Sequence, residues 1–269
     1  MGISTILGIV GGFACIIIGI LLNGRITDFL DPASIFITLG GTICALIVSY
    51  PIPQLLDTLK SLKFAFKGQK EDPARKIQLI IDLANTARKE GLLALENMLE
   101  DIPDPFLRKG IMLIVDGSNS ELVKSVMETE LYYIQERHNR CISVLNAGAG
   151  YAPAFGMAGT LIGLIAMLVS LEDASKLGPS MSVALVTTFY GVLIANFFFS
   201  PLSRNLKTLS AQEQMIDEMM LEGILSIQDG ENPRMIRDKL EAFVSGREIA
   251  VLDARIEQAK QTASAERQE

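Results

Sequence analysis

Two long stretches without a charged side chain constrain this chain more than any other feature. They cover residues 141–171 and 177–203, and only the short link 172–176 separates them. Because a helix rises about 1.5 Å per residue, each stretch is long enough to cross a hydrocarbon core about 30 Å thick. We therefore predict a transmembrane helical hairpin, and one that holds hydroxyl groups but no Lys, Arg, His, Asp or Glu.

The composition requires a polar part beside this membrane part. Hydrophobic residues make up 49% of the 269 positions and the mean hydropathy is +0.34, which is high for a water-soluble domain. Charged residues nevertheless make up 20%, too many for a chain wholly in lipid. The net charge of −7 argues against a nucleic-acid partner, because such proteins carry a basic excess.

The first 24 residues form a further uncharged stretch. No Lys or Arg precedes Arg25, so the basic region of a signal peptide is missing and we predict a retained transmembrane helix. Gly8 and Gly12 lie four residues apart, as do Gly11, Cys15 and Gly19, which favours close approach of another helix. The ordinary abundance of glycine in membrane helices explains the same pattern equally well.

A second span is predicted to begin at Asp31-Pro32, where an N-cap residue precedes a proline at the first helical position. It should end near Tyr50, because Pro51 and Pro53 discourage continuation of the helix. Together with the hairpin this gives four spans.

Basic residues set the orientation of these spans. The two short links carry one each, Arg25 and Lys176, whereas residues 51–150 hold thirteen and the residues after Ser203 hold nine. Since cytoplasmic loops attract Lys and Arg, both termini are expected in the cytoplasm. The sequence thus predicts an all-α polytopic membrane protein with four transmembrane helices and a cytoplasmic helical domain. The expected divisions are 1–50 (spans 1 and 2), 51–146 (cytoplasmic insert), 147–203 (spans 3 and 4) and 204–269 (cytoplasmic tail with a disordered end).

The insert should begin with an amphipathic helix. An apolar stripe at helical spacing is flanked by cations, which is typical of a helix lying on the inner membrane surface near anionic headgroups. The stripe consists of Leu55, Leu59, Leu62 and Phe66, and the cations are Lys60, Lys63 and Lys67.

Further helices are predicted from start and stop signals. One should run from the Asp72-Pro73 cap to Gly91, and short helices should cover 92–100 and 106–115. Ser118 and Glu121 resemble a capping box that opens a helix running from 120 into the third span. The fourth span should likewise continue into 202–227, and the polar end 255–269 is expected to fray.

Hydroxyl groups are the candidate chemistry of the hairpin. Thr160 and Thr188 lie fourteen residues on either side of Ala174, so they should sit at similar depth, with Thr187 adjacent. They could face a shared pore, or each could bond a carbonyl of its own helix, as membrane hydroxyls often do. Small residues recur every four positions and favour close helix contact; they are Gly148, Ala152, Gly156 and Thr160, and then Thr187, Gly191 and Ala195.

Two prolines lie near the cytoplasmic ends of the hairpin. Pro153 and Pro201 each remove one internal hydrogen bond and can set a bend. Such bends could couple membrane motion to the polar part, or they could reflect irregular packing alone.

Nothing in the sequence indicates an enzyme or a metal site. His138 is the only histidine and stands between two arginines, where a solvated residue is expected. Cys15, Cys44 and Cys141 have no paired spacing. No nucleophile, base or metal cluster stands out, and no cofactor is predicted.

Three segments of the hairpin carry a distinctive sequence: APAFGMAGTLIGL at 152–164, VALVTTFYG at 183–191 and SPL at 200–202. These segments resemble those of the MotA/PomA family, the A subunit of the bacterial flagellar stator. The resemblance implies a homopentamer in the bacterial inner membrane around two helices of a MotB/PomB-type partner, whose aspartate binds the translocated ion. The cytoplasmic domain would then push the rotor's switch protein.

The resemblance also implies roles for particular residues. Arg88 and Glu96 match the charged pair that engages the rotor, although without it they would count as ordinary solvated charges. Pro153 and Pro201 match the family's two functional prolines. Sodium-driven, PomA-like members share a threonine at Thr160 with the Thr187-Thr188 pair, so sodium is favoured over protons as the ion.

Two other readings stay open. An ExbB/TolQ-like subunit would also surround a partner's helices and use ion flow, but those proteins resemble three-span chains with a differently placed loop. A passive membrane scaffold would use the threonines and prolines only for packing.

Overall fold

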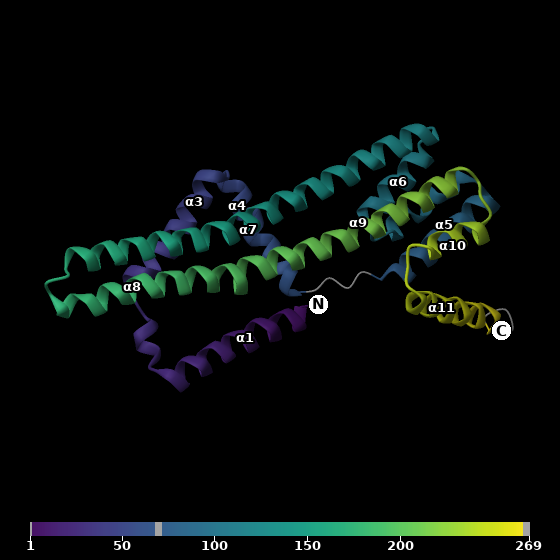
Figure 1. The fold of residues 1–269 in the computed structure, drawn as a ribbon. Helices are drawn as coiled ribbons and strands as arrows, with labels where there is room; N and C mark the ends of the chain where they lie inside the picture. Colours follow the sequence, from purple (N-terminus) through teal and green to yellow (C-terminus); the bar gives the residue numbers. More distant parts are fainter. Residues whose placement is uncertain (1, 68–71, 266–269) are drawn as a thin grey trace. The chain divides into compact units, whose positions relative to one another are not determined.

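The computed structural model describes the backbone of residues 2–67 and 72–265, and side chains within 7–62 and 72–257 except 9 and 256. Every regular element in these residues is a helix, which confirms the all-α prediction. Figure 1 draws the helices along the chain from purple to yellow. The chain divides into two compact units: unit 1 comprises Met1–Gln69 and Arg137–Leu209, and unit 2 comprises Lys70–Glu136 and Ser210–Glu269.

Unit 1 consists mainly of apolar helices. Its N-terminal elements are α1 (Gly2–Asn23), the 3₁₀ turn η1 (Ile26–Phe29), α2 (Pro32–Ile35), the π-helical η2 (Phe36–Gly40), α3 (Gly41–Ser49) and α4 (Ile52–Lys67). Its second part contains the later half of α7 (Ser120–Val169), α8 (Ala174–Leu193), the π-helical η4 (Ile194–Phe199) and the start of α9 (Ser200–Gln228).

Local signals set the limits of the second apolar helix as predicted. The Asp31 carboxylate accepts a hydrogen bond from the Ser34 backbone N–H at 2.7 Å, and Pro32 takes the first helical position. The helix then runs through α2, η2 and α3. It ends at Ser49, because Tyr50 is extended and Pro51 follows.

Three of the described helices are long and apolar enough to cross a membrane. They are Pro32–Ser49 and segments of Ser120–Val169 and Ala174–Gln228, and Val10–Asn23 is a shorter apolar helix. The side chains of residues 2–6 and 9 lie outside the described set, so α1 is judged here only on its later part.

Both hairpin helices continue beyond the apolar stretches, as predicted. The helix α7 runs unbroken from Ser120 to Val169, and α9 runs from Ser200 to Gln228. The predicted capping box at Ser118 and Glu121 is wrong. Asn119 caps α7 instead, because its side-chain oxygen accepts from the Leu122 N–H at 2.8 Å.

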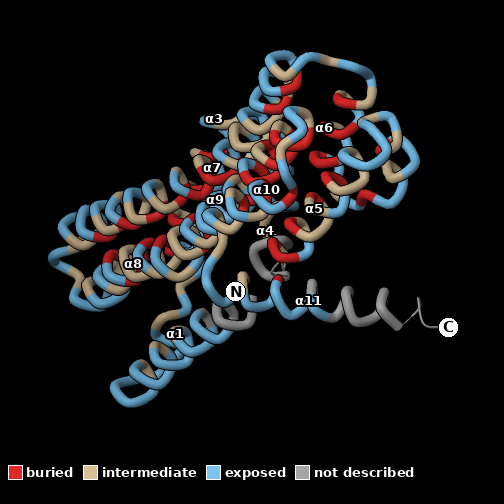
Figure 2. The backbone as a smooth tube through the Cα atoms, turned by 90° about the vertical axis from the view of Figure 1, so that its right-hand side faces the viewer, coloured by how far each residue is buried: buried red, intermediate tan, exposed pale blue. Residues whose placement is uncertain are grey.

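Unit 2 surrounds a single apolar core. Its elements are α5 (Pro73–Glu90), the 3₁₀-helical η3 (Leu92–Asp101), α6 (Pro105–Val115), α10 (Pro233–Glu241) and α11 (Gly246–Ala265), with the first part of α7 and the later part of α9. Buried residues, marked in red along the backbone tube in Figure 2, come from most of these helices. They include Ile80, Leu107, Met219, Met220, Ile224 and Leu240, which are all fully buried.

Capping and breaking residues fix the elements around α5. The Asp72 side chain accepts from the Arg75 N–H at 3.1 Å, and Gly91 ends the helix with a φ of +90°, which favours glycine. The expected frayed end at 255–269 is helical up to Ala265, since Leu252 of α11 is fully buried in the core. Residues 266–269 lie outside the described part, as do the side chains of Lys63, Phe66 and Lys67.

Candidate functional site

The helices α7 and α8 approach each other until their backbones touch. A Cβ added at Gly163 would lie 2.7 Å from the Ala184 backbone N, and one at Gly191 would lie 2.6 Å from the Ala152 carbonyl oxygen. Any larger residue at either position would push the helices apart, as expected for small residues in a membrane interface. The i+4 pattern identified Gly191 and Ala152 but missed Gly163.

Thr160 of α7 and Thr188 of α8 meet at this contact. Their hydroxyl groups are hydrogen-bonded to each other, and the Thr160 hydroxyl also lies 2.9 Å from the Ala184 carbonyl oxygen on the opposite helix. The expectation from spacing, that the two threonines lie at one depth, is therefore confirmed. Both residues are half-buried.

Either hydroxyl can be the donor in the bond between Thr160 and Thr188. The Thr160 hydroxyl has the Ala184 carbonyl at 2.9 Å as an acceptor, and the Thr188 hydroxyl has the Gly156 carbonyl at 3.4 Å. Because a hydroxyl oxygen has two lone pairs, the Thr188 oxygen keeps at least one of them in both arrangements. An oxygen lone pair is the ligand that a partly dehydrated hard cation requires.

Thr187 is fully buried and has a different surrounding. Its hydroxyl donates within its own helix, with the Val183 oxygen at 2.9 Å and the Ala184 oxygen at 3.1 Å. It thus shares the Ala184 acceptor with Thr160, and Thr160 in turn is hydrogen-bonded to Thr188, so the structure brings the three predicted threonines together. Of the three, Thr187 has no surface through which it could contact an ion.

A row of hydroxyl residues on the second apolar helix packs against the same place. The Thr38 hydroxyl donates to the Thr187 carbonyl at 3.3 Å, and the Thr42 hydroxyl donates to the Thr38 carbonyl at 2.6 Å. Ser34 completes the row and, like the two threonines, is buried. Sequence reasoning missed these residues, although their spacing of four in an uncharged stretch was the available signal.

The two predicted prolines occupy different settings. Pro153 lies inside α7 at the close contact, where its Cα would be 3.1 Å from a Cβ added at Gly191. Pro201 is the second residue of α9 and follows directly on the π-helical η4. π-helical turns often occur at functional positions and at irregularities of the hydrogen-bond ladder.

Arg88 and Glu96 lie on either side of the α5–η3 corner of unit 2. Both are exposed, and neither has a hydrogen bond or ion pair to another described residue. Arg88 and Lys89 stand in the last turn of α5, where cations suit the helix dipole. Leu95 is fully buried beneath Glu96, while Leu93 is 72% exposed, so the corner presents both signs of charge beside an apolar side chain.

In the described part of the chain, no three His, Cys, Asp or Glu side chains are placed to hold a metal ion. The three cysteines are unpaired, with Cys15 and Cys44 exposed and Cys141 buried. The thiol positions therefore add no candidate site.

Comparison with known proteins gives the family. The N-terminal model of motility protein A matches residues 6–91, and the model of the MotA/TolQ/ExbB proton channel family matches residues 98–219. Motility protein A of Treponema phagedenis is 40% identical over 256 residues, which cover 95% of this chain and 99% of that protein. The chain belongs to the motility protein A family.

Other members of the family match over similar lengths. Chemotaxis protein PomA of Vibrio alginolyticus is 38% identical over 91% of this chain and 96% of its own length. The structure of the flagellar MotAB stator complex from Bacillus subtilis contains a chain that is 30% identical, with a TM-score of 0.84 over 92% of this chain and 98% of that one. The model that matches residues 98–219 thus describes a proton channel family, and the solved relative is part of a flagellar stator complex.

Proposed function

We propose that the chain is the A-type stator subunit of a bacterial flagellar motor, which turns the rotor by using ion flow. The observation that carries this proposal is the match over 92% of the chain to the subunit of a flagellar MotAB stator complex. Expression in a flagellated bacterium that lacks its own A subunit, together with the cognate partner, should restore swimming. An ExbB/TolQ-like protein would leave these cells non-motile.

We place the protein in the bacterial inner membrane with four spans and both termini in the cytoplasm. The spans are α1, α2 to α3, the apolar half of α7, and α8 with η4. The uneven distribution of Lys and Arg supports this orientation. At 22 residues, α1 is long enough to cross.

The ion's counter-charge is proposed to come from a MotB/PomB-type partner held within a ring of five copies of this chain. Ionisable residues mark most ion pathways through membranes, yet residues 141–171 and 177–203 contain none. A partner aspartate supplies the missing charge. The Thr188 oxygen supplies neutral coordination beside it.

Sodium is favoured over protons as the coupling ion. A hydroxyl oxygen with a free lone pair suits a hard cation, while a proton needs no such ligand. Swimming speed should therefore rise with external sodium at fixed membrane potential. If swimming speed did not change with sodium and swimming stopped on addition of a protonophore, protons would be the coupling ion.

Substitutions at Thr188 separate an ion path from a passive scaffold. Thr188→Val keeps the shape of the side chain and removes its oxygen. Half-maximal swimming speed should then require a sodium concentration at least about tenfold higher, because one hydrogen-bonding group contributes about that factor to the binding of an ion. Thr188→Ser is the matched control and should retain near-normal sodium dependence. Unchanged sodium dependence in Thr188→Val, with assembly intact, would favour the scaffold.

The rotor-facing surface is proposed to be the α5–η3 corner with Arg88 and Glu96, and Pro153 and Pro201 are proposed to couple motion of the hairpin to it. Exposure and the lack of described ion pairs leave both charges available to a switch protein. Opposite charges of this kind steer encounter and fix register.

A further inference from the structure

An apolar groove runs through unit 1, and Thr160, Thr187 and Thr188 are not among the residues that line it. Its volume is about 1010 Å³, and side chains of α1 to α4 face those of α7, α8 and η4 across it. Ile43 and Ile47 of α3 and Leu56 and Leu59 of α4 line it, and these four are between 48% and 61% exposed. In a membrane, a hollow lined by exposed apolar side chains is filled by lipid or by another protein segment.

The walls offer that molecule no free hydroxyl donor. The polar residues among those lining the groove are Thr38, Thr42, Thr58 and Tyr190. Each hydroxyl already donates to a backbone carbonyl, those of Thr187, Thr38, Gln54 and Phe29 respectively. The three threonines are also buried, at 0–3% exposure. Since a polar ligand would lose most of its own hydrogen bonds here, an apolar occupant fits the groove.

The helix α4 gives the groove a charged rim at one end. Lys60 follows Leu56 by four residues, so it stands beside the leucine face that enters the groove. Its ammonium group lies 3.1 Å from the Asp57 carboxylate, and these side chains are 73% and 63% exposed. An exposed pair of this kind is weak and leaves the cation open to a stronger anion.

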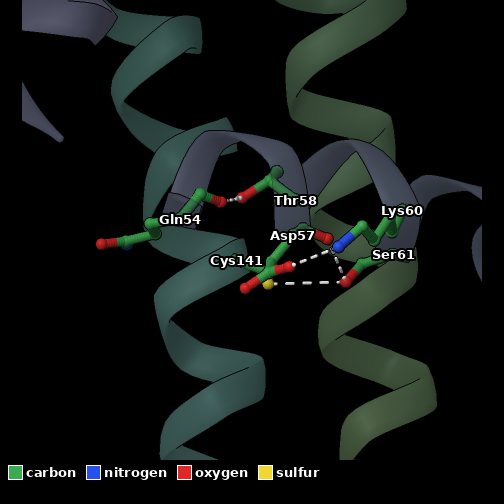
Figure 3. A network of polar contacts seen from close by, with 6 residues as sticks. All are labelled: Gln54, Asp57, Thr58, Lys60, Ser61 and Cys141. Atoms are coloured by element: carbon green, nitrogen blue, oxygen red, sulfur yellow. Dashed lines mark hydrogen bonds and ion pairs between the residues drawn. The ribbon is translucent and has the colours of Figure 1, made fainter. Parts of the chain in front are cut away.

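Two contacts close to Asp57 and Lys60 fix α4 to α7, which holds the leucine face and Lys60 in place. Gln54 donates to the Arg140 carbonyl at 2.9 Å, and the Ser61 hydroxyl contacts the Cys141 sulfur at 3.4 Å. Figure 3 shows Ser61 and Cys141 joined on one side of α4, with Asp57 and Lys60 beside them. Tyr50, directly before α4, is a residue type that concentrates at the membrane surface.

We propose that this groove binds an anionic glycerophospholipid, with the acyl chains along α3 and α4 and the phosphate at Lys60. An apolar body that needs no hydrogen bonds, joined to one anionic group at a membrane surface, describes such a lipid. The volume is at the upper end of the range for pockets that hold single small molecules. The inference depends on membrane insertion but not on the ion or the rotor.

Tryptophan fluorescence can test this, because the chain contains no tryptophan. The full-length Ile43→Trp protein is placed in phosphatidylcholine vesicles that contain a minor fraction of brominated lipid, either phosphatidylglycerol or phosphatidylcholine. Brominated phosphatidylglycerol should quench the groove tryptophan at about fivefold lower mole fraction, the preference expected from one cation near the membrane surface. Ile18→Trp, exposed on α1 and not lining the groove, is the matched control and should show no preference.

Two additional substitutions should change the lipid preference in opposite directions. Adding Lys60→Gln should abolish the preference, and adding Asp57→Asn should increase it, because the competing carboxylate is removed. Equal quenching of Ile43→Trp by both lipids would show that the groove contacts bulk lipid without a preference for an anionic headgroup, and would overturn the proposal. Quenching by neither lipid would show that protein, such as a second copy of the chain, covers the groove. Neither outcome bears on the stator function.

Discussion

At the scale of single residues, Asp72 combines two stabilising roles at the start of α5. It caps the helix and lies 2.7 Å from the Arg255 guanidinium of α11, whose hydrogen bond lowers the pKa of Asp72 more than burial raises it. Because the folded-state pKa lies below that of the unfolded chain, the stabilisation is present above about pH 4 and is lost as the pH falls through the folded-state value.

Substitution separates these two roles of Asp72. Asp72→Asn keeps a capping oxygen and loses only a partly exposed ion pair, so it should lower the free energy of unfolding in detergent at pH 7 by about 1 kcal/mol at most. Asp72→Ala also loses the cap and should lower it by about another 1 kcal/mol. The deficit of Asp72→Asn should disappear in acid; a deficit that persists at pH 3 would show that the charge is not its cause.

Arg88 and Glu96 carry a second residue-scale prediction. Because neither has a described partner, Arg88→Glu and Glu96→Lys should leave stability unchanged within about 0.5 kcal/mol. We expect swimming to fail in both while membrane assembly stays normal. Lys89→Glu is the control, because it changes a neighbouring charge of the same helix turn. If it alone abolished swimming, Lys89 would be the rotor-binding residue in place of Arg88 and Glu96.

At the scale of elements, the contact between α7 and α8 is the feature most sensitive to side-chain size. Gly163→Ala places a methyl group against the backbone of Ala184 and should destabilise the hairpin by about 1–3 kcal/mol. Gly150→Ala on the same helix meets no atom within 4 Å and should be neutral or slightly stabilising. Unfolding midpoints in detergent compare them, and equal midpoints would contradict the close contact.

The elements also show how far sequence reasoning reaches. The caps at Asp31-Pro32 and Asp72-Pro73 and the stop at Gly91 were predictable, because each depends on neighbouring residues alone. The meeting of Thr160 with Thr188 followed from equal distances to the hairpin tip. The choice of Asn119 over Ser118 as a cap was not predictable, since both residues can cap a helix.

Other features depend on packing between distant segments. The π-helical η2 and η4 have no local sequence signature. The role of Thr38 depends on its hydrogen bond to the Thr187 carbonyl, 149 residues away in the sequence. The polar composition of residues 255–269 led us to expect a frayed end, whereas α11 is helical up to Ala265. The buried side chain of Leu252, which packs in the core, was not recognised from the sequence.

At the scale of the whole molecule, the two units contain different parts of the proposed machinery. Unit 1 holds the apolar helices, the threonine contact and the groove, and unit 2 holds the charged corner at Arg88 and Glu96. The helices α7 and α9 each contribute residues to both units. In the proposed function, a second chain binds the ion.

The most direct test of this account is single-particle imaging of the protein purified with its MotB/PomB-type partner. We predict a ring of five copies around two partner helices, with a partner carboxylate at the level of Thr160 and Thr188. A ring without central helices, or a partner bound only outside it, would contradict the claim that another chain supplies the charge for the ion.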